Sequence, residues 1–284
     1  MARVLVIANE TIGGRNLLET LRQRRQEDPD LNVVICVPRT EPRHGAVIYD
    51  EAVFQSAQVR VDLARAWLRQ NEDIDAVGEV GDPDPYTAAM DAVREYDPNG
   101  IIVSTKPATI SGWLRRDLVE RIEDASGLPV EHVVTDIDAE GLPFKVTLVV
   151  ANRTSSSRQL RDRLNAIAQE DGGPSQHLFI CVVPQEGGHG NAALAARGRL
   201  GQMVDRLRSD ELLVAGMIGD PDPYTATMNG LQAFRVDAVV ISTLGPERSG
   251  WLRADLIERV KRSAKCPVEH VVAERAGAEP AQAA

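Results

Sequence analysis

Short, continuous apolar runs recur along the chain, and each has the length and composition of a buried strand. In the first half they are residues 2–8 (ARVLVIA), 31–37 (LNVVICV), 74–80 (IDAVGEV), 100–105 (GIIVST) and 129–134 (PVEHVV). Runs of this kind, in which polar residues do not alternate with apolar ones, are typical of strands covered on both faces. The first half therefore predicts five strands.

The segments between these runs have the period of helices. Residues 13–26 carry three leucines at helical spacing. Residues 49–70 place five apolar side chains on one helical face: Val53, Ala57, Val61, Ala64 and Leu68. Residues 85–96 and 112–125 complete the set of helices. Because strand and helix alternate throughout, we expect an α/β fold, in which a parallel sheet is wrapped by helices.

The string GDPDPYTA occurs twice, from Gly81 to Ala88 and from Gly219 to Ala226. At this spacing, residues 81–134 and 219–272 are identical at 26 of 54 positions without a gap, which is far beyond chance. Further upstream VIANET aligns with VVANRT, and ICV with ICV, after small changes in spacing. The chain is therefore a duplication of one globular domain.

The repeat sets the expected domain bounds. We place the first domain at residues 1–135 and the second at residues 144–273, joined by a polar linker at 136–143. Residues 274–284 (ERAGAEPAQAA) have the composition of a frayed, flexible tail. Each domain should hold its own doubly wound, parallel five-stranded sheet.

Composition narrows the class of protein. Hydrophobic residues make up 43% and charged residues 26% of the chain, a balance typical of folded globular proteins. No apolar run is long enough to span a bilayer, and the N-terminus reads as a strand without a signal-peptide pattern, so we expect a cytoplasmic protein. The net charge of −10, without a basic stripe, argues against nucleic acid as a partner.

Motifs for catalysis or metal binding are missing from the sequence. Cys36, Cys181 and Cys266 lie in apolar surroundings without a C-x-x-C pair, so we expect reduced thiols rather than disulfides or a zinc site. There is no Ser-His-Asp spacing and no Walker loop. An enzyme is therefore the least favoured class, with His44 near Ser104 as its one candidate base.

Several motifs together resemble the universal stress protein family. The resemblance is carried once per half by the GDPDPYTA turn before the third helix and by the final strand PVEHVV. It implies a Rossmann-like, adenine nucleotide alpha hydrolase-like sheet of strand order 3-2-1-4-5, dimerisation through the fifth strand and, in many members, ATP or AMP above strands one and four. The chain is thus similar to a tandem universal stress protein.

The same resemblance implies how the halves associate. Each fifth strand would otherwise be an apolar exposed edge, so we expect an intramolecular pseudo-dimer with residues 129–134 beside residues 267–272. His132 and His270 would then be interface residues. Further homo-oligomerisation remains open.

An open parallel sheet of any family binds ligands where the strand order reverses, at the carboxyl ends of strands one and four. Polar side chains arrive there in both halves. The candidate ligand-binding residues are Asn9, Thr11, Arg15, Val37, His44, Gly81, Asp82, Ser104 and Thr105, and in the second half Asn152, Thr154, Arg158, Val182, His189, Gly219, Asp220, Ser242 and Thr243. Any one Asn or Thr is also an ordinary helix cap, and the joint placement is what favours a ligand site.

The repeated GDPDP string permits more than one interpretation. Asp82-Pro83 and Asp84-Pro85 each suit a helix N-cap followed by proline at the first helical position. Alternatively the string shapes the crevice wall, with Gly81 allowing a ligand base or ribose to approach. A metal-binding role for the two aspartates is less favoured, because no third ligand lies nearby in the sequence. The prolines remove N–H donors, so phosphate suits this helix start poorly.

The phosphate loop of ATP-binding members, G-x2-G-x9-G-[S/T], is missing from both halves. The aspartate usual at the end of strand one is Asn9 or Asn152. An anion could still bind the amides of the two SGW segments. The candidates for this are Ser111, Gly112, Arg115, Ser249, Gly250 and Arg253. The alternative is that the serines cap the fourth helices and that Trp113 and Trp251 pack in the core.

Two functions of different class follow. The first is a non-catalytic stress-response protein whose crevices bind an adenine nucleotide or a small anion. AMP-like ligands should bind at least as well as ATP, because few amides are left to hold the outer phosphates. The second is a protein-interaction module of the same fold that has lost nucleotide binding. A ligand that co-purifies with the protein would discriminate between them.

Overall fold

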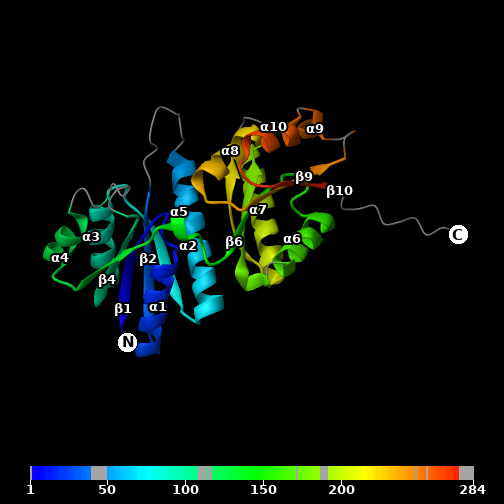
Figure 1. Cartoon of the computed structure of the whole chain (residues 1–284). Coiled ribbons are helices and arrows are strands. Elements are labelled where there is room, and N and C mark those ends of the chain that lie inside the picture. The colour runs from blue at the N-terminus through cyan, green and yellow to red at the C-terminus, as the bar shows by residue number, and fades with distance from the viewer. Residues whose placement is uncertain are drawn as a thin grey trace. The chain divides into compact units, whose positions relative to one another are not determined.

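The computed structural model of the chain describes residues 2–39, 50–107, 113, 117–170, 172–185, 191–245, 247, 249–253 and 255–274. The chain divides into two compact units, Met1–Pro143 and Phe144–Ala284. Each unit holds one parallel sheet with helices packed on it (Figure 1). Within the described residues, no helix combines the length and the apolar character needed to cross a bilayer.

The first unit has the strand order β3-β2-β1-β4-β5. Its strands are β1 (Arg3–Ile7), β2 (Asn32–Pro38), β3 (Ala76–Gly81), β4 (Gly100–Thr105) and β5 (Val130–Val134). The central strands β1, β2 and β4 are almost entirely buried, as their continuous apolar runs predict. The edge strand β5 is more exposed, and Val134 keeps 41% of its surface accessible.

Helices cover both faces of this first sheet. They are α1 (Arg15–Glu27), α2 (Asp50–Glu72), α3 (Pro85–Tyr96) and α4 (Leu118–Ser126). Leu5 and Ile7 of β1 pack with residues of α3 and α4 in one apolar cluster, to which Trp113 adds its partly buried ring. A short helix, α5 (Ile137–Glu140), lies in the segment between the repeats, and the Asp136 side chain caps it.

The second unit repeats the plan with the strand order β8-β7-β6-β9-β10. Its strands are β6 (Lys145–Val150), β7 (His177–Pro184), β8 (Leu213–Gly219), β9 (Ala238–Leu244) and β10 (Val268–Ala273). Its helices are α6 (Arg158–Glu170), η2 (Pro174–Gln176), α7 (Asn191–Ser209), α8 (Pro223–Ala233), α9 (Gly250–Arg253) and α10 (Leu256–Ser263). Leucines of α6 and α7 share one apolar cluster with Val149 and Phe179 of the sheet.

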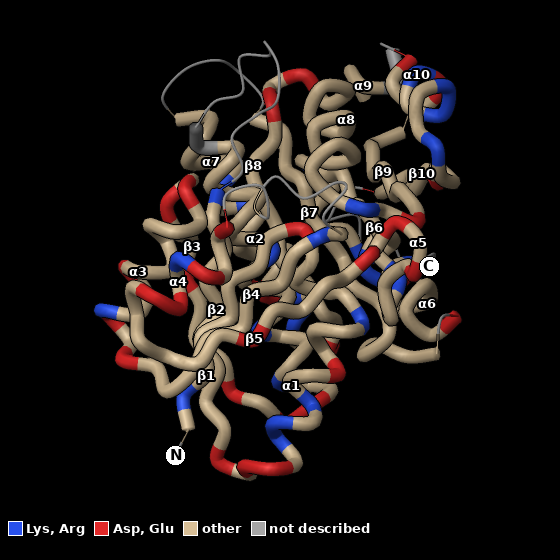
Figure 2. The backbone as a smooth tube through the Cα atoms, turned by 60° about the vertical axis from the view of Figure 1, so that its left-hand side comes forward, with Lys and Arg blue, Asp and Glu red and all other residues tan. Residues whose placement is uncertain are grey.

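The expected order 3-2-1-4-5 is confirmed in both units, and every strand pairing is parallel. The order reverses between β1 and β4 and between β6 and β9. The strands carry few charged residues, whereas helices and strand ends carry many (Figure 2). The reversal therefore places the polar residues that follow β1, β4, β6 and β9 together at the carboxyl edge of each sheet.

The fourth helix differs from the sequence prediction, which ran it unbroken over residues 112–125. Asp117 has φ 48° and Asp255 has φ 50°, so a single left-handed residue precedes each of α4 and α10. In the second unit the short helix α9 stands before this break as a separate element. An α-helix cannot continue through a left-handed residue, because its carbonyl no longer points along the helix axis.

The three cysteines are free thiols. Cys36 and Cys181 are fully buried in the two sheets. Burial raises the pKa of Cys181 to about 12 and raises the pKa of Cys36 as well. Both thiols therefore stay protonated at neutral pH and behave as apolar core groups.

Candidate functional site

A buried asparagine follows the first strand of each sheet and ties it to the second strand. The side-chain amide of Asn9 donates to the carbonyl oxygen of Pro38, the last residue of β2, at 2.7 Å. Asn152 makes the matching bond to Pro184 at the end of β7, at 3.1 Å. The asparagine is thus part of the floor at the carboxyl edge, on the β1–β2 or β6–β7 side of the reversal point.

A buried threonine two residues further on crosses the reversal point itself. The Thr11 hydroxyl donates to the carbonyl oxygen of Ser104 in β4 at 3.0 Å. The Thr154 hydroxyl donates to that of Ser242 in β9 at 2.9 Å. The loop after the first strand is therefore fastened to the fourth strand in the same way in both units. Within each unit the structure thus brings two of the sequence-predicted residues together, Thr11 with Ser104 and Thr154 with Ser242.

The last threonine of the fourth strand contacts a histidine of the edge strand. Thr105 Oγ1 lies 2.9 Å from His132 Nε2, and Thr243 Oγ1 lies 2.8 Å from His270 Nε2. Each threonine hydroxyl also lies within hydrogen-bond distance of the next backbone carbonyl oxygen, to which it donates its one proton. The Nε2 atom must then carry the proton that it donates to the threonine. Burial lowers the pKa of both histidines.

Three buried polar atoms at this edge have no hydrogen-bond partner among the described residues. They are the hydroxyl oxygens of Ser104 and Ser242 and the side-chain carbonyl oxygen of Asn152. Leaving a buried polar group unpaired costs about 1–3 kcal/mol. The two serines occupy equivalent positions in the two units, so the same unpaired hydroxyl recurs at the same point of each reversal.

The glycines of the repeated turn let the third helix pack closely against the strand end. A Cβ atom at Gly81 would lie 2.7 Å from Ala88 Cβ and 2.8 Å from Cys36 Sγ. At Gly219 it would lie 2.7 Å from Ala226 Cβ and from Val182 Cγ1. The third helix of each unit therefore rests directly on the strand end. Val37 and Val182, two of the candidate residues, are wholly buried in the sheet core.

The second aspartate of each repeated turn caps the third helix, which confirms the capping prediction for Asp84-Pro85, whereas the same prediction for Asp82-Pro83 is wrong. Asp84 accepts hydrogen bonds from both the backbone N–H and the hydroxyl of Thr87, at 3.2 and 3.0 Å. Asp222 does the same for Thr225 at 2.9 and 2.8 Å. The cap is thus the second aspartate of each string, with proline at the first helical position.

The first aspartate of each string supports the second. Asp82 accepts from the backbone N–H of Asp84 at 2.9 Å, and Asp220 accepts from that of Asp222 at 2.8 Å. In the part of the chain that the structure describes, no group of three or more His, Cys, Asp or Glu residues is arranged to hold a metal ion.

Two predicted arginines are engaged away from the crevice. Arg15 donates to the carbonyl oxygen of Leu142 at 3.2 Å. Arg158 pairs with Asp162, one turn further along α6, at 3.3 Å. Both contacts direct the guanidinium groups along the outside of their own unit, so neither arginine joins the asparagine, threonine and serine floor.

The two crevices differ in charge, a feature that the sequence interpretation missed. Glu10 after β1 forms an ion pair with Lys106 after β4, which spans the reversal point of the first unit. The matching positions in the second unit hold Arg153 and Leu244. The sequence could have predicted this ion pair, because Glu10 and Lys106 have opposite charges and follow two neighbouring strands. The first crevice therefore has an ion pair across its reversal point, whereas the second has an arginine and a leucine at the matching positions.

Several candidates cannot be placed. His44, Ser111, Gly112, Arg115 and His189 lie outside the described residues, and the Arg253 side chain does too. Ser249 is buried just ahead of α9, and its backbone N–H donates to the carbonyl oxygen of Gly245 at 3.0 Å. Gly250 is the first residue of α9.

No protein-family model and no curated protein matches the sequence. Among solved structures, a universal stress protein from Archaeoglobus fulgidus DSM 4304 is similar over 98% of this chain and 97% of its own, with 14% identity and a TM-score of 0.35. The apo structure of OtsA and a structure described as trehalose-6-phosphate from E. coli bound with UDP-2-fluoro glucose each cover 85% of this chain and 78% of their own. Their identities are 11% and 12%, and their TM-scores are 0.24 and 0.23. The strand order within each unit, rather than a likeness at these TM-scores, defines the fold of this protein.

Proposed function

We propose that the chain is a tandem, universal stress protein-like protein of the stress response, without catalytic activity, that binds an adenine nucleotide or small anion at the strand reversal of each unit. The observation that carries this proposal is the polar floor at the carboxyl edge, which recurs in both units around Ser104 and Ser242. An unpaired hydroxyl buried at the one place where this fold accommodates ligands is a feature that ligand binding would explain.

AMP-like ligands should bind at least as well as ATP. Neither half has the glycine-rich loop whose amides would hold the β and γ phosphates. The third helix of each unit begins with proline and is preceded by two aspartates, which repel additional negative charge. In the first crevice the Lys106 charge is already matched by Glu10. We expect the second crevice to be the tighter one for an anion, since Arg153 stands where the first has Glu10.

The first test is to identify, by mass spectrometry, what co-purifies with the protein, and then to compare AMP with magnesium-ATP in thermal melts. A ligand at 100 times its dissociation constant stabilises a fold by about 2.7 kcal/mol, which a melt detects readily. We expect AMP to raise the melting temperature at least as much as ATP at matched concentration. A much larger shift with ATP would show that the protein does bind the β and γ phosphates and that the preference for AMP is wrong.

Serine variants test the site itself. Ser104→Ala and Ser242→Ala remove hydroxyls that pair with no described residue, so each should leave the ligand-free protein at least as stable. Each should also reduce the AMP-induced shift from its own unit alone, which makes the two variants controls for each other. An unchanged stoichiometry and shift in both would place the ligand elsewhere.

The second candidate function is a protein-interaction module. It is favoured by the exposed valines on the edge strands, Val134 at 41% and Val272 at 49% accessibility. Apolar groups on an unpaired strand edge attract another strand or chain. The absence of any shift with AMP and ATP, together with the absence of a co-purifying small molecule, would favour this function over the first.

A further inference from the structure

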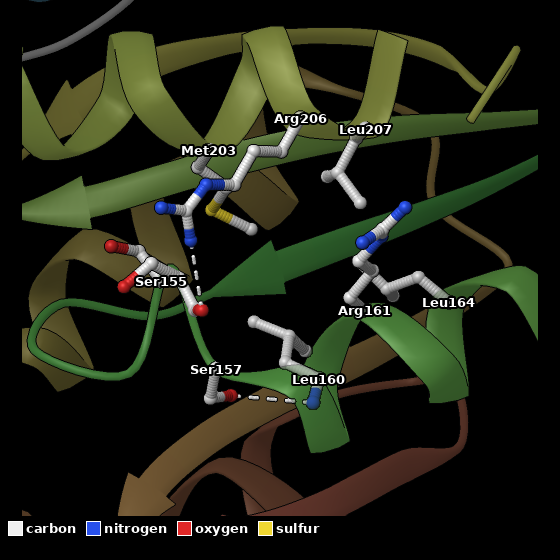
Figure 3. Close-up of a pocket in the computed structure, with 9 residues that line it drawn as sticks. Ser155, Ser157, Leu160, Arg161, Leu164, Met203, Arg206 and Leu207 are labelled. Atoms are coloured by element: carbon white, nitrogen blue, oxygen red, sulfur yellow. Dashed lines mark hydrogen bonds between the residues drawn. The ribbon is translucent and has the colours of Figure 1, made fainter. Parts of the chain in front are cut away.

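A small pocket of about 20 Å³ opens between the first turn of α6 and the C-terminal part of α7 in the second unit (Figure 3). Its floor is apolar and includes Met203 and Leu207. Its polar side is formed by the three consecutive serines 155–157, which lead into α6, and by Arg206, which reaches across from α7. Polar donors from two helices therefore converge on one small cavity.

The serines divide into one that caps the helix and two whose hydroxyls are unused. Ser157 accepts from the backbone N–H of Leu160 at 3.3 Å, as an N-cap does. Ser155 is only 9% exposed, yet its hydroxyl makes no hydrogen bond with any residue that the structure describes. The hydroxyl of Ser156 is likewise unused within the described ranges. The first backbone N–H groups of α6 have no partner inside the helix either and carry its positive dipole end.

The charge of the pocket comes from Arg206. One guanidinium N–H of Arg206 donates to the carbonyl oxygen of Ser156 at 3.0 Å, and no described carboxylate pairs with this arginine. Arg161, also in the lining, is neutralised instead, because its Nε donates to Asp210 at 2.6 Å. Arg206 therefore keeps both its charge and several N–H donors beside the serine hydroxyls.

The first unit provides an internal comparison at the same place in the fold. α1 and α6 align residue by residue, which sets Ile12, Gly13 and Gly14 against the three serines and Leu18 against Arg161. The backbone N–H of Ile74 donates to Leu68 O, and that of Leu212 donates to Leu207 O.

These two bonds, which span six and five residues, anchor the chain after α2 at Leu68 and the chain after α7 at Leu207, and this match aligns the last turns of the two helices. Trp67 is therefore the counterpart of Arg206, and it is 6% exposed. An indole ring and apolar residues thus occupy the positions that carry donors in the second unit. The donors are not a requirement of the fold, because the first unit builds the same helix pair without them.

We propose that this pocket binds a tetrahedral oxyanion of the phosphate class, either inorganic phosphate or the phosphoryl group of a small metabolite. Unpaired hydroxyls, a helix N-terminus and an arginine without a carboxylate are the donors that such an oxyanion recruits. Its volume of about 20 Å³ is far below the roughly 300–1,000 Å³ of sites that enclose drug-sized ligands, so it suits no more than a single small anionic group. This site is separate from the crevice of the proposed function and stands or falls independently of it.

The test is a calorimetric titration of the full chain with inorganic phosphate at constant ionic strength, with chloride as the reference anion. We expect one phosphate per chain. Arg206→Met should weaken binding at least tenfold, and Ser155→Ala should weaken it several-fold. Arg199→Met removes the same charge from α7 outside the pocket lining and should leave binding unchanged. Melts without phosphate check that each variant is folded; Arg206 is exposed, so its replacement should not disturb the fold.

Competition then separates the two sources of the anion. If saturating AMP displaces phosphate, the pocket receives the phosphoryl group of a nucleotide; if both bind at once, it takes the free anion. Ser242→Ala, which alters the crevice, should not change phosphate binding. Equal loss of binding in Arg206→Met and Arg199→Met, wild-type affinity in Arg206→Met, or no phosphate binding at all would overturn the proposal.

Discussion

The hydroxyl of Thr105 lies 2.9 Å from Nε2 of His132, and the pair Thr243–His270 repeats this contact at 2.8 Å in the second unit. Both histidines belong to edge strands, and each threonine lies in the strand beside them, Thr105 as the last residue of β4 and Thr243 as the last but one of β9. The contact fixes the ring tautomer, because the threonine proton is directed to a backbone carbonyl. The edge strand is thereby held to its sheet by a side-chain bond in which the imidazole is the donor.

The burial of these two imidazoles predicts a pH dependence of stability. Burial lowers the folded-state pKa of both histidines below 6.5, so the unfolded chain binds protons first as the pH falls. The stabilisation is complete above pH 6.5 and is lost as the pH falls through the folded-state values. Urea unfolding at a series of pH values should show this loss. The double variant His132→Gln, His270→Gln should show a shallower dependence, and an identical slope would contradict the assignment.

The capping aspartates should matter more than the aspartates that precede them. Asp84→Ala or Asp222→Ala removes two hydrogen bonds at a helix start and should cost about 0.5–2 kcal/mol of stability. Asp82→Ala removes one hydrogen bond outside the helix and should cost less. Chemical denaturation of the three variants measures the ranking. An equal loss in all of them would show that the GDPDP string acts through some other contact.

The turn glycines should tolerate no side chain. Gly81→Ala or Gly219→Ala brings a methyl group to 2.7 Å from another Cβ atom, and overpacking of this kind costs about 1–3 kcal/mol. Gly198→Ala is the matched control: Gly198 lies within α7 with nothing within 4 Å of the added atom, and the change should stabilise the protein by about 0.5–1 kcal/mol. Similar effects of all three substitutions would refute the packing role.

The expected pseudo-dimer can be tested in solution. A short thiol cross-linker should join Val134→Cys to Val272→Cys within one chain, if the two apolar edge strands meet. The background should carry Cys266→Ser, since Cys266 is the one partly accessible thiol. Val77→Cys on the opposite edge of the first sheet, also exposed, replaces Val134→Cys in the control. Equally fast cross-linking in the control would rule out the pairing.

The sequence by itself determined the architecture of each unit. Continuous apolar runs, helical periods and the aspartate–proline helix starts are local patterns that depend on a few neighbouring residues. Because the domain is duplicated, the sequence contains each of these patterns twice. That is why the alternation of strands and helices, the two sheets and the capping role of GDPDP could be predicted, whereas the strand order was an expectation from the family resemblance. The break before α4 and α10 was missed, because a left-handed residue at Asp117 or Asp255 leaves no signature in an otherwise helical pattern.

Only the tertiary structure decided which side chains meet. Asn9 reaches the end of β2, and Lys106 faces Glu10, although each pair is separated in sequence by at least one helix and one strand. The pocket of the second unit depends on how the last turns of α7 pass the start of α6. Such contacts are set by the packing of whole elements, since no local period encodes the distance between residues that the fold brings together from far along the chain.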